Sequence, residues 1–345
     1  MSHDDGRRGG AAGRPEVSVL LPVHNGGVQL PEAIDSILGQ TFSDFELVIV
    51  DDASTDSTAA YLASLQDPRV RVLRNERNLG VARSLNRAIR ESSGEYIARQ
   101  DADDVSEPTR LARQVKILNT APNVGIVATA ARWIDGQGNV IKHFCPTSGD
   151  DLDVRWRLLF NNVLPHTSVM ARRTAIKDGY SESADTWLVE DYELWNRVAR
   201  THHIVTIPEE LVRFRWQASS LSELHSDSQT KQRGEVRLRE ARELVGGYLP
   251  RNLYEDFLAI YFVGAEEFPQ LSGERVRAAT DFATKLQAAF YARSGRMKFA
   301  VLRHRAKVRF HWAAHLLRLA VCAPQRDLRW RASVVTSATR LMFAG

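Results

Sequence analysis

Glu95-Tyr96-Ile97-Ala98-Arg99-Gln100-Asp101-Ala102-Asp103-Asp104 combines a short apolar strand with an acidic turn. In open α/β sheets, ligands bind beyond the carboxyl ends of the strands, which is where this turn falls. Mg²⁺ and Mn²⁺ prefer oxygen ligands and leave coordination positions for phosphate oxygens. The stretch therefore predicts a divalent-cation site that carries a nucleotide diphosphate. A solvated Asp-rich surface turn is the structural alternative.

Two apolar runs upstream predict the sheet to which this strand belongs. Val17-Ser18-Val19-Leu20-Leu21 and Phe45-Glu46-Leu47-Val48-Ile49-Val50 are typical of buried strands. Between them, apolar residues recur at helical spacing from Leu30 to Leu38, and Gly39 stands where such a helix would stop. This βαβ pattern predicts parallel strands, with Asp51-Asp52 at the same edge as the acidic turn.

The rest of the first 200 residues alternates in the same way. The pattern predicts a helix from a Ser54 or Asp56 cap to Leu65, a strand at 70–73, a helix at 81–89, a helix from Pro108 to Leu118, a strand at 124–128, a hairpin at 133–141, a strand at 167–170 and a helix that begins near Asp191. The structural alternative for an acid at that helix start is a favourable interaction with the helix dipole and no catalytic role.

Composition limits the class of protein. The chain of 345 residues has two cysteines, Cys145 and Cys322, at no metal-ligand spacing, which fits a reducing cytosol. Residues 1–15 lack the apolar core of a signal peptide and are expected to form a disordered tail. No apolar run is long enough to span a bilayer.

The charge is unevenly distributed. The sixty residues from Leu286 carry twelve Lys and Arg and one acid, about +11, so residues 1–285 sum to about −7. From about Asp227 the pattern is helical, so we expect domains at 16–226 and 227–345. Basic and apolar residues interleaved on helices suit an anionic membrane surface, and packing on the core or on a second subunit is the alternative. No nucleic-acid recognition motif accompanies the charge.

With these segments in order, residues 17–222 resemble the family 2 inverting glycosyltransferases of GT-A fold. The segments that carry the resemblance are Val19-Leu20-Leu21-Pro22-Val23-His24-Asn25, Val50-Asp51-Asp52-Ala53-Ser54-Thr55-Asp56, Asn78-Leu79-Gly80, Asp101-Ala102-Asp103-Asp104 with Pro108 and Arg110, His166 with Ser168, and Glu190-Asp191-Tyr192-Glu193-Leu194-Trp195. The resemblance implies an α/β fold of GT-A type. It has a Rossmann-like, mostly parallel central sheet flanked by helices, here followed by a helical C-terminal extension.

The resemblance also implies a binding site for the nucleotide-sugar donor. Pro22, Val23 and His24 would form a backbone shelf under the nucleoside, and Asp52 would accept the base imide N–H. Capping of the next helix is the alternative for Asp52. Arg83 would pack near the base or phosphates. Asp101 would face the ribose, and Asp103, beyond Ala102, would bind the metal, Mn²⁺ or Mg²⁺. Asp104 would organise the turn, with Arg110 as its ion-pair partner.

On the acceptor side, the resemblance makes Asp191 the general base of a single-displacement reaction. Glu190 would orient the site. Trp195 would stack on a sugar or fill the core, and His166 would contact the acceptor or make a structural hydrogen bond. One departure concerns the metal. Many relatives carry Arg-x-His near the end of the domain, and here Gln217 stands at the His position. An amide is a poorer transition-metal ligand than imidazole, which leaves the metal identity open.

The function that follows is transfer of one sugar from a UDP- or dTDP-linked donor to a hydroxyl of a glycan or lipid-linked precursor. Such an enzyme would work in polysaccharide biosynthesis at a bacterial cell surface. It would be cytoplasmic or peripheral on the inner face of the plasma membrane, and its oligomeric state is left open. Two alternatives remain: a sugar-phosphate nucleotidyltransferase and a catalytically inactive sugar-nucleotide-binding protein.

Overall fold

The apolar run at Val17 forms a strand, β1 (Val17–Val23), in which every residue is buried. The computed structural model describes residues 13–144, 150–216, 225–262, 271–294, 298–322 and 328–343. Most of the predicted tail and Gln217 lie outside these ranges. The chain divides into two compact units, Met1–Arg233 and Gly234–Gly345.

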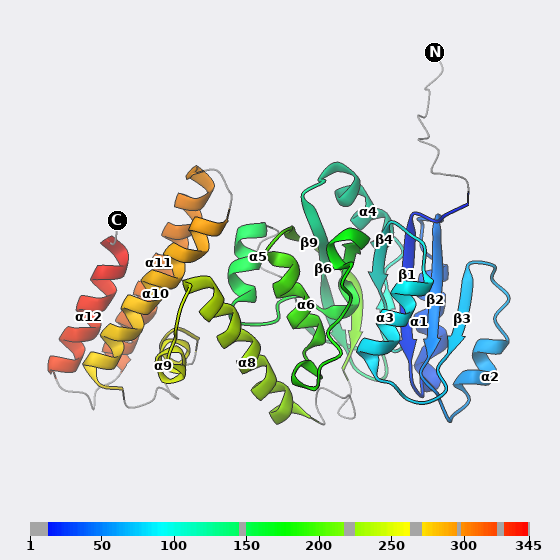
Figure 1. Ribbon diagram of the computed structural model, residues 1–345, viewed down its shortest axis with the longest axis horizontal. Coiled ribbons are helices and arrows are strands. Elements are labelled where there is room, and N and C mark those ends of the chain that lie inside the picture. Colours follow the sequence, from blue (N-terminus) through cyan, green and yellow to red (C-terminus); the bar gives the residue numbers. More distant parts are fainter. Residues whose placement is uncertain are drawn as a thin grey trace, which may run out of the picture. The chain divides into compact units, whose positions relative to one another are not determined.

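The first unit is built on one sheet (Figure 1). Its strands are β1, β2 (Phe45–Asp51), β3 (Val70–Arg74), β4 (Tyr96–Arg99), β5 (Val105–Ser106), β6 (Val124–Ile134), β7 (Val140–Phe144), β8 (Met170–Arg172) and β9 (His203–Arg215). They run in the order β3-β2-β1-β4-β8-β6-β9-β5, and β7 pairs with β6. The predicted parallel arrangement holds for β3-β2-β1-β4. Beyond β4 the sheet is mixed, because β8 runs antiparallel to both neighbours.

Helices cover this sheet as the apolar spacing predicts. They are α1 (Leu30–Leu38), α2 (Thr58–Ala63), α3 (Val81–Glu91), α4 (Arg110–Thr120), α5 (Asp151–Leu158) and α6 (Glu190–Ala199). On α1, Leu30, Ala33, Ile34 and Ile37 are buried, and the helix ends at Gly39. α3 contacts β1 and β2 (Figure 1). The predicted α/β fold is therefore confirmed.

One predicted strand is displaced. Residues 167–170 were expected to be extended, but His166–Ser168 form a short 3₁₀ helix, η2, and β8 begins at Met170. Pro165 precedes this turn, and its carbonyl accepts hydrogen bonds from the Ser168 amide, at 2.9 Å, and from the Ser168 hydroxyl, at 2.8 Å. These local bonds compete with strand pairing.

A buried polar network fixes the chain before the acidic turn. The fully buried Arg110 guanidinium donates to the Arg99 carbonyl at 2.6 Å and to the Ser106 hydroxyl at 2.7 Å. It also donates to the side chains of Gln100 and Gln114. Gln100 in turn donates to the Asp104 carbonyl at 2.7 Å. These bonds from Arg110 are to oxygens other than the Asp104 carboxylate, the partner expected from the sequence.

The second unit is helical. Its helices are the latter part of α8 (Ser226–Val245), α9 (Arg251–Phe262), α10 (Gly273–Arg293), α11 (Lys298–Cys322) and α12 (Leu328–Phe343). Aromatic side chains form its core, with the ring of Phe257 5.7 Å from that of Trp312 and 5.3 Å from that of Phe282. Within the described residues, no helix is long and apolar enough to cross a membrane.

We predict that Arg110→Met lowers the free energy of unfolding by about 3 kcal/mol or more, because the buried acceptors around it lose their donor. Urea unfolding measures this loss. Arg113→Met is the matched control on α4. Arg113 pairs with Glu209 on the surface, so its loss should cost less than about 1 kcal/mol. Equal losses in the two variants would show that the network does not stabilise the fold.

Candidate functional site

The carboxyl ends of β1 and β2 come together as the sequence predicts. Val23 lies opposite Asp51 in the parallel register, and the His24 ring nitrogen Nδ1 is 2.8 Å from the Asp52 carbonyl oxygen. Pro22 and Val23 are buried, whereas His24 is exposed. Four predicted donor-site residues, Pro22, Val23, His24 and Asp52, therefore lie side by side at this edge.

Asp52 anchors a loop that the sequence did not connect to it. Its carboxylate is 4% exposed and accepts hydrogen bonds from Asn75 Nδ2 at 2.6 Å, the Leu79 amide at 2.9 Å and the Gly80 amide at 2.8 Å. The turn towards the next helix is closed by its neighbour Asp51, which accepts the Ser54 amide at 2.9 Å. Asp52 thus holds the loop before α3 instead of capping α2.

Arg83 lies in the first turn of α3, the helix that follows that loop. Its side chain is 52% exposed, and its Nε atom is 3.4 Å from a carboxylate oxygen of Glu182. The loop that carries Glu182 is held on α3 by Asn86, which exchanges hydrogen bonds of 2.9 and 2.8 Å with the Tyr180 backbone. Arg83 therefore joins α3 to the loop that leads to Glu190.

The acidic turn places Asp101 beside a buried arginine. Arg99 is 4% exposed, forms an ion pair with the Asp101 carboxylate and donates to the Gln100 carbonyl. Burial raises the pKa of Asp103 to about 6. The negative charge of Asp101 raises this pKa further, whereas the positive charges of Arg215 and Arg99 lower it. Burial also raises the pKa of Asp104, which accepts the Arg215 amide at 2.7 Å. The turn therefore concentrates carboxylates that gain from an additional cation.

Glu190 and Asp191 form a second acidic pair at the start of α6. Asp191 accepts Asn162 Nδ2 at 2.7 Å and the Tyr192 amide at 2.6 Å. Burial raises the pKa of both carboxyl groups, that of Glu190 to about 7, and the charge of Asp101 raises both further. The charge of Asp101 therefore acts on both carboxyl groups at the start of α6.

His166, Tyr180 and Trp195 pack together next to this pair. His166 Nε2 is 2.9 Å from the Tyr180 hydroxyl, and the His166 ring is 5.7 Å from that of Trp195. Burial, together with the charge of Arg99, holds the pKa of His166 well below its usual range, so its imidazole is neutral. Trp195 is fully buried, which favours its core role over sugar stacking. His166 makes the structural hydrogen bond that was one of its two expected roles.

Three residues of this region were missed or underestimated from the sequence. Asn162 and Tyr180 lie in loops without a readable pattern, and Arg215 was noted only as part of the segment near Gln217. Arg215 donates its backbone N–H to Asp104 and its Nε to the Asp103 carbonyl at 3.0 Å. Only the alternation of Arg213 and Arg215 on one face of a strand could have indicated its inward direction.

The residues of the acidic turn fit a divalent ion that is shared with a ligand. Among the described residues, no group of three or more His, Cys, Asp and Glu side chains could hold a metal by itself. Asp101 and Asp103 offer carboxylate oxygens, and burial, followed by the charge of Asp101, raises the pKa of Asp103. Ions such as Mg²⁺ are commonly held by one or two carboxylates and substrate phosphates.

Comparison with known proteins decides the family. The model of the family "Glycosyl transferase family 2" matches residues 18–179. An uncharacterized glycosyltransferase of Methanocaldococcus jannaschii is 30% identical over 213 residues, which are 60% of this chain and 72% of that protein. The chain belongs to glycosyltransferase family 2. The resemblance seen in the sequence is thus confirmed.

Other relatives agree with this assignment. EpsE of Bacillus subtilis is 34% identical to this family 2 chain over 188 residues, 53% of the chain and 66% of EpsE. The crystal structure of Staphylococcus aureus TarS 1–349 in complex with UDP-GlcNAc superimposes with a TM-score of 0.54 and 17% identity, covering 95% of this chain and 90% of that one. This likeness confirms the GT-A fold.

We predict that Asp52→Asn lowers the free energy of unfolding by about 1–3 kcal/mol, because an amide NH₂ would face one of three hydrogen-bond donors. Amide hydrogen exchange at Leu79 and Gly80 should accelerate. Asp56→Asn is a control at an exposed carboxylate and should leave exchange at Leu79 and Gly80 unchanged. Unchanged exchange in Asp52→Asn would contradict the anchoring role.

Proposed function

We propose that this family 2 glycosyltransferase transfers one sugar, with inversion, from a nucleotide-diphosphate sugar to a hydroxyl of a glycan or lipid-linked glycan precursor. The proposal is supported by two acidic segments, the turn after β4 and the Glu190–Asp191 pair at the start of α6, on which the charge of Asp101 acts. One acidic segment suits the leaving diphosphate with its cation, and the other suits a base for the attacking hydroxyl.

The donor would lie along the edge formed by Val23, Asp52 and Asp101. Asp103, with Asp101 beside it, would hold the Mn²⁺ or Mg²⁺ ion, which supplies positive charge to the departing diphosphate. The Asp52 carboxylate has accepted three hydrogen bonds, so its remaining lone pair can accept a base imide N–H. A crystal structure of S. aureus TarS, which has the same fold, contains UDP-GlcNAc. UDP-linked sugars are therefore the first donors to test.

In the proposed reaction, deprotonated Asp191 takes the proton of the acceptor hydroxyl. The hydroxyl oxygen forms a bond to the anomeric carbon as the bond from that carbon to the diphosphate oxygen breaks, so the nucleotide diphosphate leaves with the bonding electrons. Asn162 and the Tyr192 amide hold the Asp191 carboxylate in place. No carboxylate nucleophile is needed, because the displacement occurs once.

The sequence left two alternatives, a sugar-phosphate nucleotidyltransferase and a catalytically inactive sugar-nucleotide-binding protein. The family assignment favours glycosyl transfer over sugar-phosphate nucleotidyl transfer. A catalytically inactive binding protein would not require a base with a raised pKa near the acidic turn. Loss of turnover in Asp191→Asn separates this alternative from the enzyme.

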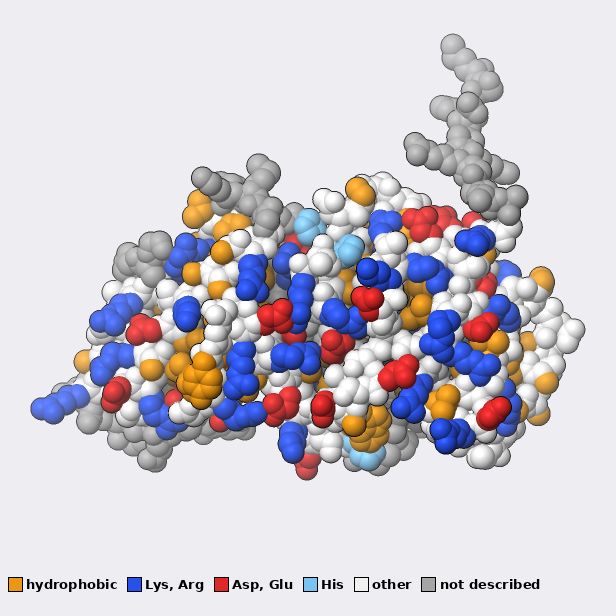
Figure 2. All heavy atoms as spheres, in the orientation of Figure 1, with side chains coloured by type: hydrophobic (Ala, Val, Ile, Leu, Met, Phe, Trp, Pro, Cys, Tyr) orange, Lys and Arg blue, Asp and Glu red, His pale blue; other side chains and the backbone are white. Residues whose placement is uncertain are grey.

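We also propose that α11 attaches the protein to an anionic membrane surface. On α11, Leu302, Phe310 and Leu317 are 60%, 70% and 37% exposed, and Arg303, Lys307 and Arg318 are exposed with them. Figure 2 shows Lys and Arg side chains mixed with hydrophobic ones over the helices of the second unit. Such a surface suits a headgroup layer, where each cation contributes about 1 kcal/mol.

We predict that Asp103→Asn reduces Mn²⁺-dependent binding of UDP or dTDP roughly 10-fold or more, because the ion loses a carboxylate ligand. Calorimetry with and without Mn²⁺ measures the difference. Asp35→Asn, an exposed acid on α1, should bind like the parent. Equal affinity of Asp103→Asn and the parent in Mn²⁺ would remove the metal role of Asp103.

We predict that Asp191→Asn lowers sugar transfer roughly 100-fold or more, while donor affinity and melting temperature stay near those of the parent. An amide retains the shape but cannot accept the proton. Glu193→Gln, which alters an ion pair on the same helix, should retain turnover. Near-parental turnover of Asp191→Asn would contradict the base assignment, because a capping role tolerates Asn.

The parental enzyme should lose activity as the pH falls through the raised pKa of this acidic pair. The base must be deprotonated, and burial moves its protonation to higher pH than for an exposed carboxyl group, with the Glu190 pKa at about 7. Transfer rates at saturating donor, measured between pH 5 and pH 9, should rise with pH. If the chemical step limits the rate and the transfer rate does not change with pH, the raised pKa is contradicted.

We predict that the protein floats with anionic liposomes at low salt and that salt releases it. Replacing Leu302 and Phe310 together by Gln should abolish flotation, because the apolar contacts are lost. Val335→Gln on α12, where Val335 is 42% exposed, is the control. If the parental chain does not float at low salt, α11 serves another purpose.

A further inference from the structure

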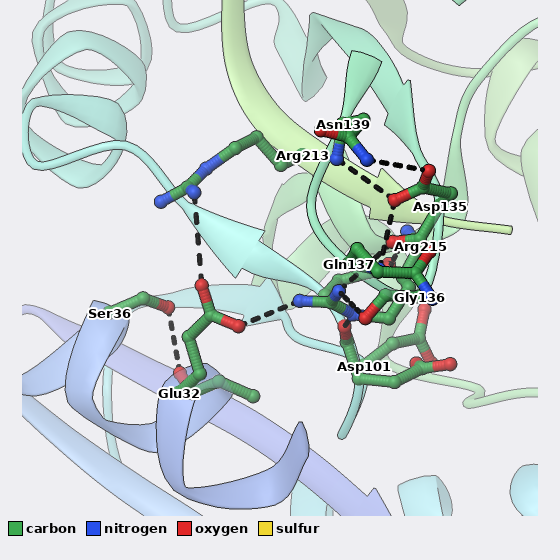
Figure 3. Close-up of polar contacts among 12 residues, drawn as sticks. Glu32, Ser36, Asp101, Asp135, Gly136, Gln137, Asn139, Arg213 and Arg215 are labelled. Carbon is green, nitrogen blue, oxygen red and sulfur yellow. Dashed lines mark hydrogen bonds and ion pairs between the residues drawn. The ribbon is translucent and has the colours of Figure 1, made fainter. Parts of the chain in front are cut away.

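Arg215, the last residue of β9, binds three segments at once (Figure 3). Its side chain is 4% exposed and its Nη2 atom is 2.7 Å from a carboxylate oxygen of Glu32 on α1. Its Nη1 atom donates to the carbonyls of Asp135, at 3.1 Å, and Gly136, at 3.4 Å, in the β6–β7 turn. Its Nε atom donates to the Asp103 carbonyl at 3.0 Å.

The backbone of Arg215 strengthens its hold on the acidic turn. Its N–H donates to Asp104 Oδ1 at 2.7 Å, so side chain and main chain bind consecutive residues of the turn. A guanidinium presents five donors in a rigid plane, whereas a lysine ammonium has three donors at one point. Lysine could keep the charge near Glu32 but could not reach the carbonyls of both turns with the same geometry.

We propose that Arg215 is a positioning residue, which fixes the main chain of Asp103 so that the Asp103 carboxylate is held ready for a divalent ion and a diphosphate. The inference rests on the proposed metal role of Asp103. It also makes the β6–β7 turn part of the donor-binding assembly, because the same guanidinium holds the Asp135 and Asp103 carbonyls.

Arg213 provides a matched comparison on the same strand face. It lies within 3.8 Å of Glu32 and 3.3 Å of Glu107, as measured between guanidinium nitrogens and carboxylate oxygens. Its ion pairs are to α1 and to the segment before α4, not to the acidic turn. Arg213→Lys therefore makes the same chemical change next to the same Glu32 partner without altering the Asp103 contact.

The experiment measures Mn²⁺ affinity in the presence of UDP by electron paramagnetic resonance of free Mn²⁺, and UDP affinity without metal by calorimetry. We expect Arg215→Lys to weaken Mn²⁺ binding roughly 10-fold or more and to leave metal-free UDP binding within about 2-fold of the parent. Arg213→Lys should match the parent in both. A merely structural role would change the melting temperature without separating the two affinities.

Two results distinguish this inference from the proposed function. If Asp103→Asn loses Mn²⁺ affinity and Arg215→Lys does not, the positioning role is wrong and the metal role stands. If neither variant changes Mn²⁺ affinity, the metal role of Asp103 fails as well. If Arg215→Lys does not fold, Glu32→Gln replaces it, because this variant removes the ion pair of Glu32 with Arg215 and keeps the other bonds of Arg215; it also removes the ion pair with Arg213, for which Arg213→Lys is the control. It should weaken Mn²⁺ binding several-fold, and parental affinity would overturn the inference.

Discussion

The concentration of buried acids in the acidic turn and at the start of α6 is the constraint on which this structure depends. Asp103, Asp104, Glu190 and Asp191 all have pKa values raised chiefly by burial. A fold can hold such groups only if buried donors and cations lie around them. Here the cations are Arg99, Arg110 and Arg215, each 4% exposed or less. Arg99, Arg110 and Arg215 each donate to at least one main-chain carbonyl, and these bonds shape the turn.

This arrangement connects the fold to its chemistry. Parallel strands bring the ends of β1, β2 and β4 to one edge, and the Arg110 network attaches that edge to α4 and η2. On the other side, Asn162 and the loop held by Asn86 place Asp191 at the start of α6. A donor and an acceptor can then approach from different segments of the chain. In the proposed reaction, the sheet edge serves the leaving group and the loops serve the acceptor.

The sequence was sufficient for those parts of the molecule that local patterns determine. Helical spacing from Leu30 to Leu38 predicts α1, and the apolar runs before Asp51 and Asp101 predict β2, β4 and the edge at which both strands end. Other features depend on residues far apart in the chain. The amide of Arg215 binds Asp104 across 111 positions, and Asn162 binds Asp191 across 29. No periodicity encodes such pairs. The hydrogen-bond partners of Arg110 were missed for the same reason, since Gln100, Ser106 and Gln114 reach it only after β4, β5 and α4 have packed.

The configuration of the first sugar product tests the central claim most directly. A single base opposite one leaving group allows only one displacement at the anomeric carbon, so the account predicts inversion. Proton NMR of the glycoside formed from an α-linked UDP-sugar distinguishes the two anomers, because a glycosidic bond does not mutarotate. A β-configured product, which Asp191→Asn should fail to form at a comparable rate, would agree with the account. An α-configured first product would contradict it, because retention requires a different set of catalytic groups.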